Sequence, residues 1–409
     1  MDTIEGTSAT AHAVLADLPV VDLDPFAEDV LADPYSVDHR LREAGALFQL
    51  SRYGILGTAR HAEVAAILAD WQAFGSSRGV GLQDFLKEPP WRAPSLLLET
   101  DPPVHSQMRR LMNGVVSLPA LKAVLPRWTA RAEALVDALA AKRRFDGMEE
   151  LAEVYPLDVF PDTIGIARDG REHLLPYAAA VFNAYGPKNA VWESTEVGLP
   201  DAVEWVNQAC RRENLGPDGW GMQVYAAADR GECTEDEAHR LVRSFLSAGI
   251  DTTVSGIGTL LLALASHPDQ WARLRAEPDL QKRAFDESLR WDSTAQVFCR
   301  TAMHDCTLGP VAIPQGTKIL LFLGAANRDP RRWDNPDRFD VSRSSSGHVG
   351  FGFGIHQCLG QMVARQEAGL VLKAMLQRFA TIRLAGAPER RLNNSLHPLA
   401  RLPLEVTPA

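Results

Sequence analysis

The chain has 409 residues and carries 42 Lys and Arg against 52 Asp and Glu, which gives a formal net charge of −10. Hydrophobic residues make up 46% and charged residues 23%, as in an ordinary soluble globular protein with a large core. The acidic balance argues against nucleic acid or an anionic membrane as the main partner, so an anionic ligand would need a local basic pocket. Five widely spaced cysteines without a C-x-x-C pair fit neither a zinc ribbon nor a disulfide framework and favour a reducing cytoplasm.

The predicted elements are mainly helical. The first eighteen residues lack a sustained apolar run, so we expect a disordered tail at 1–18 and no signal peptide. Apolar residues at spacings of three and four then predict helices over 121–144, 201–214, 235–266, 268–290 and 360–379. Shorter strand-like stretches fall at 48–59, 319–323, 380–384 and 403–406. No repeat or linker divides the chain, so the sequence predicts one mainly α domain with small β-sheets over 19–409.

One stretch, 244–265, is long enough to cross a membrane, since it has 22 residues and one charge. Seven of its positions are Ser, Thr or Asp, and the chain has no second candidate. We therefore predict a buried core helix in a soluble protein.

A glycine-rich loop with a cysteine stands before the last predicted helix and reads F-G-F-G-I-H-Q-C-L-G over 351–360. A lone cysteine is most often a small buried hydrophobe. A nucleotide-binding G-x-G-x-x-G fails here, because Gln357 stands where the last glycine is needed. The pattern F-x-x-G-x-x-x-C-x-G arises by chance in roughly one such chain in a thousand. Cys358 at a helix start is placed to be a thiolate, and the N–H groups after its sulfur can tune a bound metal.

This loop resembles the haem-binding signature of the cytochrome P450 monooxygenases. The resemblance implies a single-domain P450 fold, with haem b held between the long central helix and the helix after the loop. It also implies that Cys358 is the axial thiolate ligand of the iron, that Phe351, Gly354 and Gly360 bind the haem, and that dioxygen is the co-substrate.

A histidine and an arginine after a D-P-P stretch, His105 and Arg109, match the H-x-x-x-R of the family, which holds the haem propionates. The spacing recurs at 239–243, and only the D-P-P and the sequence order select the first copy. Arg300 and His356 complete the propionate set that the resemblance implies, since two carboxylates in an apolar site need cationic partners.

An E-x-x-R pair, Glu287 and Arg290, lies 71 residues before the cysteine, where the family has its own pair. Pairs at this spacing are common on helix surfaces, and a second copy stands at 237–240. The resemblance implies a buried structural network with Arg338 as the third member.

The predicted central helix contains A-G-I-D-T-T over 248–253. Asp251 inside an apolar helix costs free energy unless it is hydrogen-bonded or functional. The alternative is a local side-chain bond to a carbonyl one turn earlier, which bends a helix. The resemblance implies that Gly249 opens space for dioxygen and that Asp251 and Thr252 deliver protons.

The resemblance extends to bacterial P450s that oxidise para-substituted benzoates, such as 4-methoxybenzoate demethylases, over 77–82, 178–186, 241–253 and 347–354. Ser244, Ala248 and Thr252 share one helix face and span about 12 Å, which leaves room for an aromatic acid. The implied carboxylate anchor, whose arginines could instead be solvated surface residues, consists of Arg92, Ser95, Arg243 and Ser244. The implied apolar walls are Leu98, Phe182, Tyr185, Ala248 and Phe298.

Three residues depart from those relatives, which carry Phe, Val and Phe where this chain has Tyr185, Ala295 and Cys299. Ala295 widens the expected substrate pocket and Tyr185 adds a hydroxyl group. The preferred ring substituent is therefore left open.

The predicted function is a cytoplasmic, monomeric haem-thiolate monooxygenase that hydroxylates or O-demethylates para-substituted benzoic acids. The chain has no flavin or iron–sulfur motif, so two electrons are expected from a [2Fe–2S] ferredoxin with its NAD(P)H-dependent reductase. Arg110 and Arg365 are the expected ferredoxin contacts. The alternatives are a monooxygenase for a terpene, fatty acid or macrolide, a peroxide-driven peroxygenase, and a haem-thiolate sensor or gas carrier.

Overall fold

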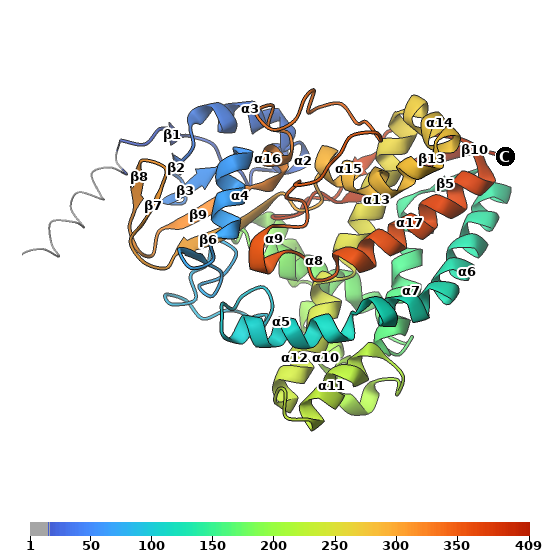
Figure 1. Ribbon diagram of the computed structural model, residues 1–409, viewed down its shortest axis with the longest axis horizontal. Helices are drawn as coiled ribbons and strands as arrows, with labels where there is room; N and C mark the ends of the chain where they lie inside the picture. The colour runs from blue at the N-terminus through green and yellow to red at the C-terminus, as the bar shows by residue number, and fades with distance from the viewer. Residues whose placement is uncertain (1–14, 16) are drawn as a thin grey trace, which may run out of the picture.

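The computed structural model describes residue 15 and residues 17–409, so most of the expected tail lies outside the described residues. Helices and sheet are segregated, with the main sheet at one side and most helices at the other (Figure 1). The helices are α2 Glu28–Ala32, α3 Tyr35–Ala44, α4 His61–Ala69, α5 Val104–Val115, α6 Leu118–Lys142, α7 Val154–Ile164, α8 Leu174–Asn183, α9 Ala190–Glu196, α10 Leu199–Ala209, α11 Trp220–Asp229, α12 Glu235–Ala248, α13 Asp251–Ser266, α14 Pro268–Ala276, α15 Gln281–Trp291, α16 Leu323–Asn327 and α17 Gln361–Arg378.

The main sheet has six strands in the order β1-β2-β3-β9-β6-β4, and a second sheet has three in the order β10-β13-β5. The two remaining sheets are two-stranded ribbons, β11-β12 and β7-β8. The strands are β1 Val20–Val21, β2 Phe48–Leu50, β3 Ile55–Thr58, β4 Phe74–Gly75, β5 Arg144–Asp146, β6 Val297–Ala302, β7 Cys306–Leu308, β8 Val311–Ile313, β9 Lys318–Phe322, β10 Phe379–Leu384, β11 Glu389–Arg390, β12 Leu399–Arg401 and β13 Pro403–Pro408. The mainly α class with small β-sheets is confirmed.

Two of the predicted long helices are each divided. The stretch 235–266 forms α12 and α13 with a break at Gly249 and Ile250, and 268–290 forms α14 and α15 around a short turn at 278–280. The predicted start of α12 is confirmed, since Thr234 and Glu237 form a reciprocal capping box. The predicted strand 48–59 is the antiparallel hairpin β2–β3.

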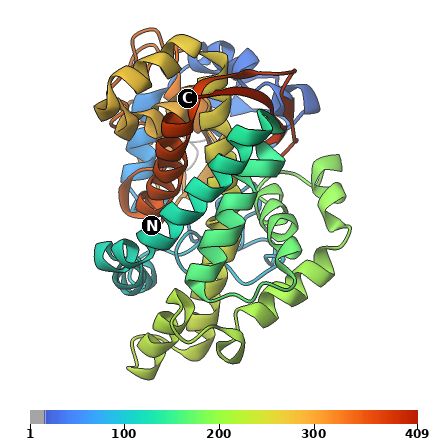
Figure 2. The ribbon, with the colours of Figure 1, turned by 90° about the vertical axis from the view of Figure 1, so that its right-hand side faces the viewer.

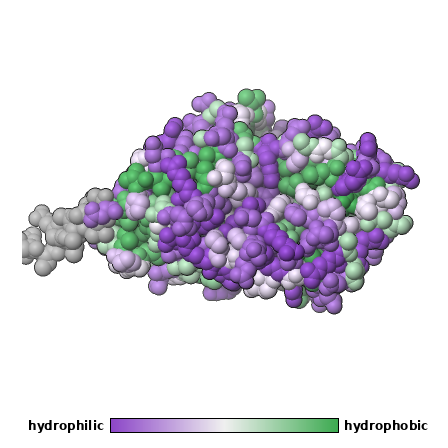
Figure 3. All heavy atoms as spheres, turned by 90° about the horizontal axis from the view of Figure 1, so that it is seen from above, coloured by the Kyte–Doolittle hydropathy of each residue, from purple (hydrophilic) through white to green (hydrophobic). Residues whose placement is uncertain are grey.

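The α12–α13 stretch passes through the middle of the molecule, as Figures 1 and 2 show. Among the described residues it is the one stretch long and apolar enough to cross a membrane, and 83% of its apolar window is buried inside the protein. Helices α15 and α17 and strand β10 pack on α13, and α6 packs on α17. Polar residues cover much of the face in Figure 3, interrupted by smaller apolar areas. This agrees with the predicted core helix.

A buried ion pair joins α15 to the irregular segment 328–349. Arg290 and Glu287 are fully buried and share two hydrogen bonds, 2.8 and 2.9 Å long. The structure corrects the expected third member: the cation that reaches Glu287 is Arg343, whose Nε lies 3.1 Å from Oε1. Arg338 is exposed and offers only its backbone carbonyl to Arg290. Residue spacing in the sequence cannot distinguish Arg338 from Arg343, because the segment 336–345 folds back on itself and brings Arg343, not Arg338, to the Glu287 carboxylate.

We expect Glu287→Gln to lower the free energy of unfolding by about 3–5 kcal/mol, because it leaves the buried Arg290 guanidinium and the partly buried Arg343 guanidinium without their carboxylate. Arg338→Ala, the matched control on the same segment, should change it by less than about 0.5 kcal/mol. Urea unfolding of the haem-loaded protein, followed by circular dichroism, measures both. A larger loss for the Arg338 variant would contradict the corrected network.

Candidate active site

An accessible stripe runs along the otherwise buried central helix. Ala248 is exposed, and Ser244 and Thr252 are half-buried, although most of the residues between them are buried. These three positions are four residues apart, so they lie on one face. Because the helix lies inside the molecule, the stripe faces an internal space, as the spacing predicts.

The helix breaks beside this stripe. The Thr252 hydroxyl group donates to the Ala248 carbonyl at 2.6 Å, and the Thr253 hydroxyl group donates to the Gly249 carbonyl at 2.9 Å. Threonine bonds of this kind bend helices, so the structural alternative considered for this motif is also present. A Cβ on Gly249 would lie 2.6 Å from the Phe160 ring. The structure thus gives Gly249 a packing reason of its own, and the space for dioxygen that the resemblance implies stays a prediction.

Asp251 is fully buried and paired. Its Oδ1 accepts a hydrogen bond from Arg391 at 2.8 Å, and its Oδ2 has no partner within the described part of the chain. The Arg391 side chain is 38% exposed. Arg391 therefore connects a buried acid beside Thr252 to solvent. Sequence reasoning missed it, because it lies 140 residues further on in a segment without a motif.

The cysteine loop presents an accessible thiol. Positive φ angles at Gly352 and Gly354 turn the chain, and the Cys358 N–H donates to the Phe351 carbonyl at 2.8 Å. The Cys358 side chain is accessible, yet desolvation by the surrounding protein raises the pKa of its thiol. Hydrogen bonds from the backbone of Gly360 oppose that rise, as the helix start predicts. An accessible thiol that is nevertheless desolvated belongs to an enclosed space, not to the outer surface.

Two buried side chains near this loop, Arg300 and His105, have no anionic hydrogen-bond partner among the described residues. Arg300 is 4% exposed, and its one hydrogen bond goes to the Cys299 carbonyl at 2.9 Å. Neither ring nitrogen of the buried His105 has a partner in the described residues. Its ring lies 4.3 Å from that of His356, which bonds Asp101 at 3.3 Å. Desolvation lowers the pKa of His105 to about 4 and that of Arg300 to about 10. The Arg300 charge and an N–H of the neutral His105 ring can therefore both bind an anionic ligand.

The four residues of the expected carboxylate anchor differ in their partners. Arg92 pairs with the buried Glu99 at 3.2 Å, so its charge is already balanced. Arg243 is 9% exposed, bonds the Ala93 carbonyl at 2.7 Å, and has no acidic partner in the described chain.

The two serines of the expected anchor make local bonds. The Ser95 hydroxyl accepts from the N–H groups of Leu97 and Leu98, and the Ser244 hydroxyl donates to the Arg240 carbonyl at 3.0 Å. The Ser95 hydroxyl still has its O–H to donate, and the Ser244 hydroxyl still has lone pairs to accept.

The expected apolar wall forms an aromatic cluster. The ring of Tyr185 lies 5.9 Å from that of Phe182 and 5.8 Å from that of Phe298. Leu98 and Ala295 are partly buried against the same core. Cys299 is fully buried and follows Phe298 on β6, where successive side chains point to opposite faces. The departure at Cys299 therefore lies on the far side of the strand from this wall.

A thiol at a helix start, with Arg300 and His105 available for an anion nearby, fits a metal-containing anionic ligand beside the cysteine loop. A family model, Cytochrome P450, matches residues 221–405. The relative named cytochrome p450 CYP199A2, from Rhodopseudomonas palustris, is 49% identical over 404 residues and covers 98% of both chains. The chain belongs to the cytochrome P450 family.

Solved P450 structures share the whole fold. Cytochrome P450 CYP109Q5 from Chondromyces apiculatus is 29% identical with a TM-score of 0.79, and the match covers 96% of this chain and 99% of that one. Cytochrome P450 CREJ in complex with (4-ethylphenyl) dihydrogen phosphate is 25% identical with a TM-score of 0.82, and covers 94% and 99%. The chain is thus a P450 monooxygenase that uses haem b, a cysteine thiolate ligand and dioxygen.

The residues of this P450 fit the haem. Cys358 would supply the thiolate, with Arg109 close enough to favour it, and the buried Arg300 and His105 fit the haem propionates. The ring nitrogens of His356 are both engaged, with the Leu97 carbonyl at 3.1 Å and with Asp101 at 3.3 Å, so its place in the propionate set stays a prediction. When bound, the haem supplies the activation of dioxygen.

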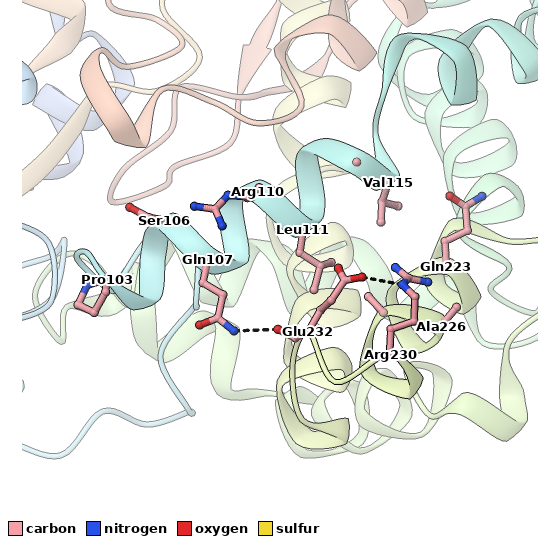
Figure 4. A pocket seen from close by; sticks show the side chains of 12 residues that line it. Pro103, Ser106, Gln107, Arg110, Leu111, Val115, Gln223, Ala226, Arg230 and Glu232 are labelled. Atoms are coloured by element: carbon pink, nitrogen blue, oxygen red, sulfur yellow. Dashed lines mark hydrogen bonds and ion pairs between the residues drawn. The ribbon is translucent and has the colours of Figure 1, made fainter.

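An open cleft of about 950 Å³ lies apart from this site, between α5 and α11 (Figure 4). Gln107 of α5 reaches across it to the Glu232 carbonyl at 2.8 Å. The exposed Arg110 is part of its lining, whereas the cysteine and the acid–alcohol pair are not. Arg365 lies beside the cysteine loop, where it pairs with Asp286 at 2.8 Å.

We expect Cys358→His to abolish the absorption band that the reduced, carbon monoxide-bound protein owes to its thiolate ligand, because an imidazole donates less electron density to iron. Cys306→Ser, a change at a half-buried cysteine on β7, should retain the band. Difference spectra of the two purified variants measure this. A retained band in the Cys358 variant would exclude it as the ligand.

Proposed function

We propose that this P450 hydroxylates or O-demethylates para-substituted benzoic acids such as 4-methoxybenzoate. One observation carries the proposal: Arg243 is a buried cation with no anionic partner among the described residues, and it stands next to Ser244, where the accessible stripe begins. A ligand carboxylate that pairs with Arg243 offsets the cost of burying that charge.

The stripe sets the length of the ligand. Ser244 lies next to Arg243, and Thr252 lies eight residues further along the same face, about 12 Å away. A benzoate ring with a short para substituent spans this interval from the anchor to the oxygen-activating site. The aromatic cluster of Phe182, Tyr185 and Phe298 supplies an apolar wall for the ring.

The structural relative cytochrome P450 CREJ supports the same ligand class. It was solved with (4-ethylphenyl) dihydrogen phosphate, a para-alkylated aromatic compound with an acidic head group. The head group differs from a carboxylate, so the likeness supports the class and not the particular acid.

The chain contributes binding and proton delivery to the reaction. Arg243 orients the acid so that the para substituent points along the stripe towards Thr252. The buried Asp251 carboxylate contacts Arg391, which reaches solvent, so a proton can pass from solvent to Asp251 along this side. Thr252 offers a hydroxyl group beside Asp251 to pass the proton on. Oxygen insertion into a methoxy group yields a hemiacetal, which collapses to a phenol and formaldehyde.

Electrons come from a [2Fe–2S] ferredoxin and its NAD(P)H-dependent reductase in the cytoplasm, and the protein acts as a monomer. The exposed Arg110 and the loop-side Arg365 are the proposed contacts with the ferredoxin, which is an acidic class of protein.

A spectral titration of the ferric haem tests the anchor. We expect 4-methoxybenzoate to shift the spin state and to bind at least tenfold more tightly than its neutral amide, because a charge-assisted hydrogen bond is worth about 1.5–3 kcal/mol. Arg243→Met should remove most of this preference. The double variant Arg92→Met/Glu99→Gln removes an ion pair whose two charges cancel, so it should retain the preference for the acid over the amide. Equal binding of acid and amide by the unchanged protein would exclude the carboxylate anchor.

Thr252→Ala should leave the affinity for 4-methoxybenzoate unchanged and reduce the phenol formed per dioxygen consumed by roughly tenfold, because the proton donor beside Asp251 is lost. Parallel measurement of dioxygen uptake, phenol and released hydrogen peroxide checks this. An unchanged yield would contradict the proposed proton route. Full turnover with peroxide and no gain from ferredoxin would instead favour a peroxygenase.

A further inference from the structure

Lys318 is a buried lysine in the central part of the main sheet. It is 6% exposed and begins β9, whose five residues are all buried. Its Nζ lies within hydrogen-bond distance of four backbone carbonyl oxygens, 3.3 Å from that of Arg78, 3.2 Å from Gly79, 2.9 Å from Gly81 and 2.8 Å from Gln83. An ammonium group has only three N–H bonds, so at least one of them is shared between two carbonyl oxygens. The four oxygens surround the charge in the way that they surround a bound metal cation.

The loop 78–84 is closed on itself around this ammonium group. Arg78 forms an ion pair with Asp84, with Nε 3.0 Å from Oδ1. Asp84 also accepts from the Leu86 N–H, so its carboxylate is engaged away from the lysine. Gly79 has φ +91°, and a Cβ there would lie 2.8 Å from the Gln83 carbonyl oxygen. The loop is therefore shaped to turn its carbonyls inward.

The same loop contacts the wall of the proposed substrate pocket. The Leu82 N–H donates to the Tyr185 carbonyl at 2.8 Å, and a Cβ on Gly81 would clash with the Tyr185 backbone. The Cys299 N–H donates to the Val80 carbonyl at 2.6 Å, which joins the loop to β6 one residue after Phe298. The loop thus contacts Lys318 on one side and the backbone of Tyr185 and of Cys299, the residue after Phe298, on the other.

We propose that the Lys318 ammonium group is a tethered cation that holds the carbonyl cage of residues 78–83 together and thereby positions Tyr185. Lys318 is a positioning residue, since it touches neither the substrate nor the haem site. The cage itself is independent of the proposed function, whereas its effect on benzoate binding rests on that function. A cage deprived of its lysine accepts a free ammonium or methylammonium ion.

The first test compares Lys318→Met with Lys87→Met in the haem-loaded protein without substrate. Lys87 is exposed next to the same loop, and its side chain has no partner among the described residues, so it is a matched loss of charge. We expect hydrogen exchange of the 79–84 amides to accelerate at least tenfold in the Lys318 variant only. The Kd for 4-methoxybenzoate should rise about threefold or more, with a smaller change in kcat. Unchanged exchange in the Lys318 variant would overturn the proposal.

Chemical rescue separates a cation-filled cage from ordinary packing. In Lys318→Ala, ammonium or methylammonium chloride should restore slow exchange, whereas tetramethylammonium chloride at the same ionic strength should not. Equal effects of all three salts would overturn the proposal.

A variant in the loop covers the case in which the Lys318 variants do not fold. Gly79→Ala disturbs the cage from the loop side and keeps the lysine, so exchange of the 79–84 amides should accelerate there too. Slow exchange in that variant would overturn the proposal. Failure of the unchanged protein to bind 4-methoxybenzoate would tell against the proposed function alone, because exchange is measured without substrate.

Discussion

The guanidinium groups of Arg243 and Arg300 lie inside the protein with one backbone carbonyl each as hydrogen-bond partner. An isolated buried charge costs several kcal/mol unless an anion pairs with it. Other buried cations in the described interior have fuller sets of partners: Glu287 pairs with Arg290, Glu99 pairs with Arg92, and four backbone carbonyls surround Lys318. These two positions therefore define where anions from outside the chain enter the interior: the haem carboxylates at one and, as we propose, a substrate carboxylate at the other.

The central helix, formed by α12 and α13, is mostly apolar and buried but also carries the polar groups proposed for the reaction. Most of its residues are buried, yet it breaks at Gly249 and Ile250, where threonine hydroxyl groups take the carbonyls of the preceding turn. The break lies between the accessible Ala248 and the buried Asp251. One helix thus carries a ligand-facing stripe and, beside it, an acid that Arg391 connects to solvent.

The sequence predicts the features that depend on local pattern. The cysteine loop, the helix period and the strand-like stretch 48–59 each depend on neighbouring residues, and the structure has all of them. The fold class follows from the same patterns and from the family resemblance. Helices such as α4 and α8 and strand β6 were not predicted, because their short segments lack a clean period.

Contacts between distant segments were beyond the sequence. Arg343 in place of Arg338, Arg391 on Asp251, Glu99 on Arg92 and Lys318 in the 78–83 cage each join side chains that only the folded chain brings together. Gly249 shows a second limit, since the motif names the residue whereas the Phe160 ring supplies the physical reason for it.

The Arg92–Glu99 ion pair has a consequence for the net charge of the ligand that the pocket can accept. Because these two charges cancel, Arg243 alone leaves the wall with a single uncompensated positive charge. A monoanion brings the enclosed space to neutrality, whereas an aromatic diacid would carry a second negative charge into it without a partner. Charge balance would therefore discriminate between acids of the same size and shape, independently of how well the ring fits its wall.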